Sequence, residues 1–340
     1  MRPRLLVSLS VVAVLVMTGL LVPVSVAGQS ADDGWTLPRT PDGHPDLRGV
    51  WANNSATPLE CPEAWADKAR LTDEELAALL VASDHAVGDG DALFGDQLVL
   101  AAIAGIEATS YDPTTGNYNQ FWIAERDFDN RTSLVIDPPD GRIPDLTPEA
   151  QARRRDGVAR RDEHPADTYT DRPLQERCVS YGVPRLGAGY NSYAQLFQSA
   201  DHVVFLNEMI HDARVIPIDG QPHLPDRVRQ LHGDSRGHWE GDALVIETTN
   251  YSLQARFLGA SDNLHIVERL TRVGPKTLNY EVTITDPTTW TRPWTVIIPL
   301  MGSDDAIFEY ACYEGNIGME GILAGHRAAE RETVAQSGST

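Results

Sequence analysis

The feature that most constrains the fold is a run of short, evenly spaced strand patterns in the C-terminal half of the chain. From residue 202 onward, apolar and polar residues alternate in segments that end at Gly-, Pro- or Asp-rich turns about every ten residues. Glu240-Gly241-Asp242 and Gly274-Pro275-Lys276 each separate two such segments and indicate hairpins. About eight strands at this spacing, uninterrupted by a long helix, predict an antiparallel barrel or sandwich over residues 175–325.

Period-two alternation also predicts which side chains are buried. Leu278, Tyr280, Val282 and Ile284 share one face of a strand, and the residues between them are mostly polar. One buried face and one solvent-exposed face are typical of an antiparallel sheet. The full set of expected strands covers residues 203–210, 214–218, 233–239, 243–249, 264–273, 277–285, 294–300 and 307–312.

The preceding part of the chain, residues 46–174, predicts an irregular, partly helical α+β region. Thr72 and Glu75 have the spacing of a capping box, and Thr147 before Pro148 has the pattern of an N-cap followed by a first-turn proline. Residues 96–109 are mostly apolar and predict a buried helix, and residues 46–51 and 132–137 predict short strands. We expect residues 326–340 to form a disordered tail.

The N-terminal segment has the pattern of a targeting sequence. Arg2 and Arg4 precede an apolar run over residues 5–22, and Ser25 and Ala27 occupy the small-residue positions of a cleavage site. We expect a signal peptide over residues 1–27 and a linker over residues 28–45. An uncleaved anchor helix is the alternative. Cleavage predicts a periplasmic or secreted protein without stable membrane insertion.

Charge and cysteine content fit an exported protein. Acidic residues outnumber basic ones 49 to 28, and the formal net charge is −21, so nucleic acid is not an expected partner. Of the three cysteines, Cys178 and Cys312 are the preferred disulfide pair in an oxidising compartment, which leaves Cys61 free. Three buried free thiols are the alternative.

Two resemblances add to these patterns. Gly49-Val50-Trp51 is similar to the short opening motif of lipocalins, which implies a calycin-like barrel in which a basic residue, here Arg327, stacks on Trp51. Nearly the whole mature chain resembles an uncharacterised family of exported bacterial proteins, and this resemblance implies an origin but no mechanism. The segments that carry it are the TPDGHPDLRGVW opening at 40–51, DPPDGRIP at 137–144, EMIHD at 208–212, GDSRG at 233–237, WEGD at 239–242 and EYAC at 309–312.

No familiar catalytic motif is present, so the candidate catalytic residues come from one strand end and from one face of another strand. Next to carboxylates, His211 is a candidate general base, oriented by Asp212 or Glu208. His265 and Arg269 lie on one face of a strand and would stabilise an anion if that face lined a cavity. The alternatives are a structural histidine at a turn and a surface arginine paired with an acidic neighbour.

Candidate ligand-binding residues are aromatic or lie between aromatics. Arg292 lies between Trp290 and Trp294, a pattern that favours a stacked loop at a barrel mouth, and Tyr280 faces the expected interior. A loop anchored on the rim by its tryptophans is the alternative. The histidines lack metal-ligand spacing, so neither a metal site nor a cofactor is predicted.

These residues predict an exported protein that binds a small organic molecule in a β-barrel cavity. Isomerase- or lyase-type acid–base chemistry is a further hypothesis, since no activated nucleophile is visible. The alternative is a non-enzymatic envelope or scaffold protein with a solid barrel core. Whether the chain is an enzyme stays open at this point.

Overall fold

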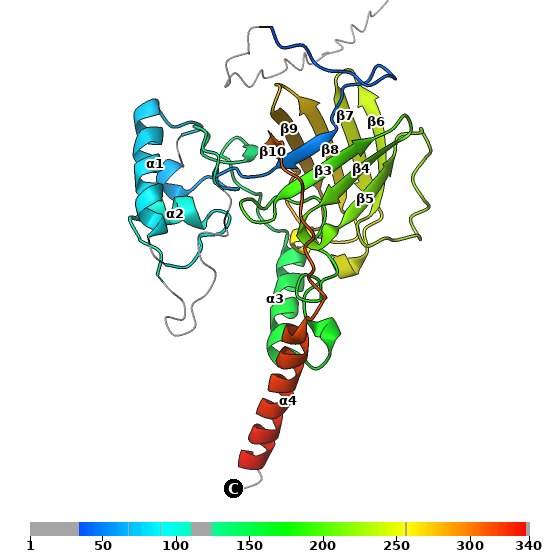
Figure 1. The fold of residues 1–340 in the computed structure, drawn as a ribbon. Helices are drawn as coiled ribbons and strands as arrows, with labels where there is room; N and C mark the ends of the chain where they lie inside the picture. Colours follow the sequence, from blue (N-terminus) through cyan, green and yellow to red (C-terminus); the bar gives the residue numbers. More distant parts are fainter. Residues whose placement is uncertain are drawn as a thin grey trace, which may run out of the picture. The chain divides into compact units, whose positions relative to one another are not determined.

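The computed structural model describes residues 34–337, except for 67, 89, 110–122, 124 and 256. The expected signal peptide and the first residues of the linker lie outside this range. The described chain centres on an antiparallel sheet of ten strands (Figure 1). Its hydrogen-bonded order is β5-β4-β3-β1-β10-β9-β8-β7-β6, with β2 pairing to β10 off this path. The strands are β1 (Gly49–Ala52), β2 (Val135–Asp137), β3 (Tyr193–Gln198), β4 (His202–Asn207), β5 (Ala213–Pro217), β6 (Asp234–Glu240), β7 (Ala243–Thr249), β8 (His265–Arg272), β9 (Thr277–Thr285) and β10 (Trp294–Ser303).

The strands and hairpins expected between residues 202 and 300 are confirmed with small shifts in their ends. In β9 the side chains of Leu278, Tyr280, Val282 and Ile284 are buried, as the alternation predicts. The strand expected over residues 307–312 is wrong, because that segment is irregular. A strand that the pattern missed, β3, pairs with β1 through contacts such as Gly49 opposite Leu196.

The sheet curls so that its two edge strands approach each other. No hydrogen-bonded ladder joins β5 to β6 in the described chain, so the sheet is not closed. The edges meet through side chains instead: a Cβ added to Gly237 of β6 would lie 2.6 Å from Ile218 Cγ2, just beyond β5. A larger side chain at this position would force Ile218 or the strand itself to shift, which favours glycine at this close approach.

The concave face of the sheet holds the main hydrophobic core. Leu196, Leu244, Ile266 and Trp294 are among its fully buried side chains. Trp51 is buried at one end, where its indole N–H donates to the carbonyl of Leu47 at 2.9 Å. The guanidinium over the Trp51 ring belongs to Arg272, 5.4 Å from the ring centroid, so the expected pairing with Arg327 is wrong.

Two helices in the first half of the chain form a small core of their own. They are α1 (Asp73–Val87) and α2 (Gln97–Ala104), which pack around Leu79, Val99 and Ala102. The capping box of Thr72 and Glu75 is confirmed at the start of α1. The apolar helix is shorter than expected, because α2 ends at Gly105 in a left-handed conformation with a φ of 64°.

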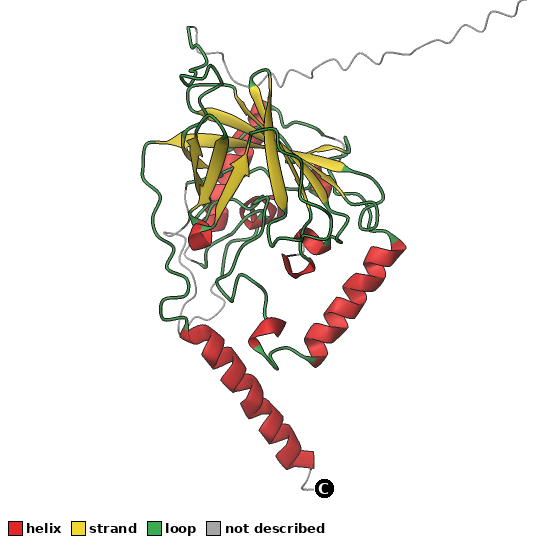
Figure 2. Ribbon diagram, turned by 90° about the vertical axis from the view of Figure 1, so that its right-hand side faces the viewer, coloured by secondary structure: helices red, strands yellow, loops and turns green. Residues whose placement is uncertain are grey.

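Two further helices lie outside the sheet (Figure 2). Thr147 caps α3 (Pro148–Glu163), with Pro148 at its first position as predicted. The expected tail over residues 326–340 is wrong as far as Ser337, since α4 (Ile317–Ser337) spans most of it. Residues 328–336 are rich in Ala, Glu, Arg and Gln, which favour helix without needing a buried face.

The predicted disulfide is present in the structure. Cys178 and Cys312 are bonded, and Cys61 is free and buried, as expected. None of the described helices is long and apolar enough to cross a membrane.

Candidate ligand-binding site

A buried ion pair crosses the interior of the curled sheet. Arg214 on β5 donates to Glu268 on β8 through both terminal guanidinium nitrogens, at 2.5 Å and 2.7 Å. The hydroxyl of Tyr280 on β9 donates to the same carboxylate. All three side chains are buried, and Glu268 is fully so. The pair exists because the curl brings strands that are distant in the sheet order face to face.

The surroundings of this cluster favour the charged form of Arg214 and the neutral form of Tyr280. Burial disfavours the guanidinium of Arg214, but the nearby Glu268 carboxylate outweighs that cost and raises the arginine's pKa. Burial, and then the negative charge of Glu268, raise the pKa of Tyr280 well above its usual value. Tyr280 is therefore a neutral donor at physiological pH and a poor acid or base.

A small cavity adjoins the cluster. Its volume is about 40 Å³, and its walls come from the inner faces of β1, β3, β4, β5, β9 and β10 together with a loop after the disulfide. Since one water needs about 10–15 Å³ of such space, the cavity has room for about three waters or one small polar group. The lining residues are Trp51, Asn53, Val183, Pro184, Arg185, Gly187, Ser192, Ala194, Phe205, Asn207, Arg214, Tyr280 and Leu300.

Arg185 gives the cavity wall a positive charge. Its guanidinium donates to the main-chain carbonyls of Asn191 at 2.6 Å and Tyr190 at 2.7 Å. In the described chain no carboxylate lies within ion-pair distance of it, in contrast to Arg214. Burial lowers the pKa of Arg185 to about 10, which still leaves it protonated at neutral pH. The guanidinium also lies 5.6 Å from the centroid of the Tyr181 ring, and the more distant charge of Glu208 favours its protonated form. The cavity therefore faces one arginine that has no direct carboxylate partner in the described chain.

Asn53 brings an unused acceptor to the same wall. Its amide nitrogen donates to the carbonyls of Leu186 and Gly187 at 3.1 Å and 3.0 Å, which holds the loop over the cavity. Its side-chain oxygen is buried and has no partner among the described residues. The residue as a whole is 5% exposed. A buried acceptor without a donor is costly, so a donor is expected beside it.

The candidate catalytic residues around the EMIHD segment separate in the structure. The chain turns sharply at Ile210 and His211, which have φ values of 60° and 38°. The His211 imidazole lies 3.2 Å from the hydroxyl of Tyr313 and does not line the cavity. Glu208 is buried and accepts from the backbone N–H of Phe308 at 3.2 Å. Asp212 faces a different histidine, so neither carboxylate bonds to the His211 ring.

That other histidine is His232, in a cluster that the sequence did not single out. Ser180 Oγ donates to Asp212 at 2.7 Å and lies 2.6 Å from His232 Nε2. In a nucleophilic triad the carboxylate binds the other ring nitrogen, whereas here Asp212 approaches the same nitrogen, at 3.4 Å. Ser180 is fully buried, and burial lowers the pKa of His232. The geometry is that of a structural hydrogen-bond network in which His232 is uncharged.

His265 and Arg269 lie on the outer face of β8, in agreement with the alternative of a surface arginine paired with an acidic neighbour. Ile266, Glu268 and Leu270 point into the core, whereas His265 and Arg269 alternate with them on the outside. Arg269 pairs there with Glu240 at 2.7 Å. Both faces of this strand carry charge, because the interior contains Glu268. The alternation grouped these side chains by face correctly, but the hypothesis that His265 and Arg269 line a cavity is wrong.

The tryptophan loop is anchored rather than open. Trp290 and Trp294 are both buried, and their rings meet edge to face with centroids 5.6 Å apart. Arg292 is not stacked between them; it is half exposed and pairs with Asp137 at 2.7 Å. Of the residues proposed from the sequence as ligand contacts, only Tyr280 reaches the cavity.

No protein-family profile, curated protein or solved structure matches this chain in the three comparisons. The functional argument therefore depends on the cavity itself.

Proposed function

We propose that this chain is an exported binding protein for a small hydroxycarboxylate, or for the hydroxycarboxylate end of a larger molecule. The observation that carries the proposal is that two residues lining the same cavity have unused binding capacity in the described part of the chain. Arg185 has no direct carboxylate partner there, and the side-chain oxygen of Asn53 has no hydrogen-bond donor. A guanidinium binds a carboxylate well, and a ligand hydroxyl would supply the donor that Asn53 needs.

The shape of the site supports a small ligand group. A cavity of about 40 Å³ is far below the roughly 300–1,000 Å³ of a site that encloses a drug-sized molecule. The aromatic side chains of Trp51 and Phe205 would flank the ligand's carbon atoms. On this proposal the curled sheet acts as a barrel-like container whose edge strands meet through side chains.

Binding is better supported than acid–base turnover. The described lining residues include no histidine and no carboxylate, and His211 and His265 lie elsewhere. Export is supported by the disulfide, which is typical of oxidising compartments, and by the pattern of the first 27 residues.

Calorimetric titration at constant ionic strength tests the proposal, with sodium glycolate and sodium acetate as probes. Glycolate is expected to bind more tightly than acetate, because only glycolate has a hydroxyl for Asn53. Arg185→Gln should weaken glycolate binding by about 10- to 100-fold, the range for a lost hydrogen bond to a charged group. Arg292→Gln, a change at an exposed arginine, is the matched control. Absent binding, or equal binding by the Arg185 and Arg292 variants, would refute the proposal.

A scaffold protein with a solid core is the second candidate, favoured by the small cavity volume and the close packing around it. Ala194→Val separates the two functions, because Ala194 lines the cavity. In a binding protein the added methyl groups block the ligand and glycolate affinity falls. In a scaffold they fill a void, so stability rises and no probe binds.

A further inference from the structure

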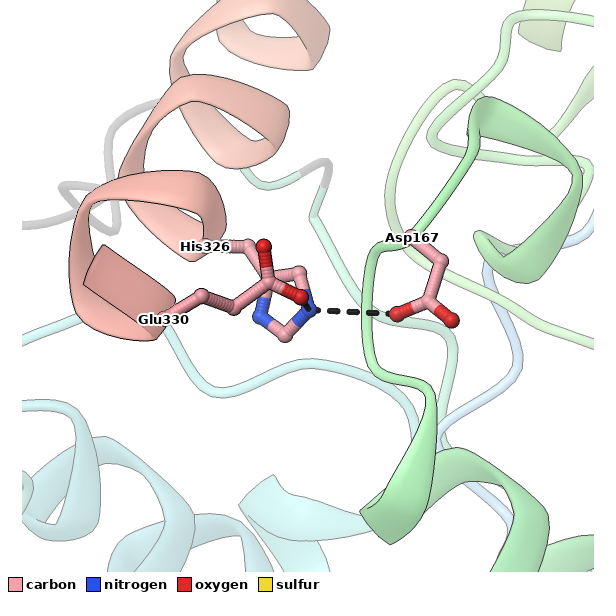
Figure 3. A group of neighbouring side chains, drawn as sticks. All are labelled: Asp167, His326 and Glu330. Atoms are coloured by element: carbon pink, nitrogen blue, oxygen red, sulfur yellow. Dashed lines mark hydrogen bonds and ion pairs between the residues drawn. The ribbon is translucent and has the colours of Figure 1, made fainter. Parts of the chain in front are cut away.

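Away from the cavity, three metal-ligating side chains converge between α4 and the turn after α3. His326 and Glu330 lie one turn apart on α4, and both reach toward Asp167 (Figure 3). His326 Nε2 lies 3.2 Å from Asp167 Oδ1 and 3.4 Å from Glu330 Oε1. The ligand atoms of all three residues lie within 4.8 Å of one another. Two carboxylates thus share one imidazole nitrogen, which carries at most one hydrogen.

These separations match the edges of a tetrahedral zinc site. With bonds of about 2.0–2.2 Å from Zn²⁺ to nitrogen and oxygen ligands, neighbouring ligand atoms lie about 3.3–3.6 Å apart. The separations of 3.2 Å and 3.4 Å from His326 Nε2 to the two carboxylate oxygens fall at or next to this range. One imidazole and two carboxylates would supply three ligands and neutralise the ion's charge, and water would complete the fourth position.

Neighbouring contacts hold the carboxylate of Asp167 in place. His164 Nδ1 lies 2.7 Å from Asp167 Oδ2, the oxygen not facing His326. Arg327 donates to the main-chain carbonyl of Asp167 at 3.0 Å. A hydrogen bond to the free oxygen of a ligating carboxylate is a common support in metal sites.

The place of the cluster in the fold gives a bound ion a clear role. Most of α4 is exposed, and its partly buried face is a narrow stripe that includes Met319, Leu323 and His326. Near its first turn α4 is held by the disulfide and by Asn316, whose amide donates to the carbonyl of Glu176 at 3.2 Å. Little apolar surface holds the helix further along, and His326 lies in that part.

We propose that Asp167, His326 and Glu330 bind Zn²⁺, and that the ion clamps the middle of α4 to the turn at residues 164–167. The sequence did not predict this site, because Asp167 is far from the helix in the chain and residues 326–340 were expected to be disordered. The site is independent of the proposed ligand cavity, so either proposal can fail without the other.

Calorimetric titration of the chelator-treated full chain with zinc chloride tests the proposal. One equivalent is expected to bind, and Asp167→Asn and Glu330→Gln should each weaken binding by about tenfold or more. Both substitutions keep the size of an exposed side chain, so the fold should persist. The matched control is His238→Gln, because His238 and Glu240 form an exposed pair at 3.2 Å that lacks a third ligand in the described chain.

Limited trypsin digestion gives a local second measurement. Cleavage after Arg327 and Arg331, both on α4, should slow when zinc chloride is added to the unmodified chain and should not slow for Glu330→Gln. Magnesium chloride should give no protection, because Mg²⁺ favours six oxygen ligands. Equal loss of zinc binding in the His238 control, or protection that persists in Glu330→Gln, would show that Zn²⁺ binds surface histidines only and would overturn the proposal.

Discussion

At the scale of single residues, charge placement in the interior is the dominant feature. Arg214 and Glu268 are fully paired inside the sheet, whereas Arg185 donates to two main-chain carbonyls, lies over the Tyr181 ring and has no carboxylate within ion-pair distance in the described chain. A buried pair costs desolvation and is strongly sensitive to loss of one partner. The interior thus contains Arg214, whose charge is used by a structural ion pair, and Arg185, which we propose binds a ligand.

The first residue-scale prediction concerns Glu268→Leu. It leaves Arg214 buried without a counter-charge, so the free energy of unfolding should fall by about 3–5 kcal/mol in urea denaturation. Adding Arg214→Met should recover part of that loss, because two apolar side chains of similar size tolerate burial together. Glu240→Gln, at the exposed pair with Arg269, is the control and should cost less than about 1 kcal/mol. A double variant that loses the sum of both single effects would contradict this account.

At the scale of elements, regular strands were predictable and irregular connections were not. In β8 and β9 strict alternation located the strands and grouped their side chains by face, but it did not show that the face of β8 with Glu268 is the buried one. The sequence of β3 contains two glutamines and only Leu196 is fully covered, so its pattern was too weak to detect. Arg185 and Asn53 lie in loops, where the sequence shows neither an apolar–polar alternation nor a recognisable motif. Their roles depend on long-range contacts that one sequence does not reveal.

The loop between β9 and β10 supports an element-scale prediction. Asp286 is buried and accepts from the backbone N–H of Ser261 at 2.6 Å and from the hydroxyl of Thr289 at 2.6 Å. Burial alone would raise the pKa of Asp286, but these hydrogen bonds outweigh it and lower the pKa. The carboxylate therefore stabilises the fold above the unfolded-state pKa of about 3.9, and this stability is lost as the pH falls through the lower folded value.

Asp286→Asn should therefore act mainly at neutral pH. We expect it to reduce the free energy of unfolding by about 1.5–3 kcal/mol at pH 7, and the deficit should shrink on acidification below about pH 4. Urea midpoints measured from pH 7 to pH 3 provide the check. Asp242→Asn, at a half-exposed carboxylate paired with Arg39, is the control and should change little at any pH. A deficit that is constant with pH would rule out the charged hydrogen bonds as its source.

At the scale of the whole molecule, the C-terminal segment is tied back to the middle of the chain. Cys312 follows β10 and bonds to Cys178, which precedes β3, across a separation of 134 residues. Both cysteines lie in irregular segments, where no sheet ladder holds the chain. The covalent bond therefore fixes the start of α4 and the loop that leads to Arg185, so that the helix, the loop and the sheet act as one unit.

Removal of this bond gives the whole-molecule prediction. A crosslink that closes a loop of this length restricts the unfolded chain and stabilises the fold by about 4–5 kcal/mol on chain-entropy grounds. The double substitution Cys178→Ser with Cys312→Ser should lower the urea midpoint accordingly, and dithiothreitol should bring the unmodified chain to the same midpoint. Cys61→Ala serves as the control, since Cys61 forms no disulfide and its loss leaves the response to the reductant intact. If dithiothreitol leaves the urea midpoint of the unmodified chain unchanged, the crosslink contributes no stability. The packing of β3, β4 and β10 would then have to hold the loop alone.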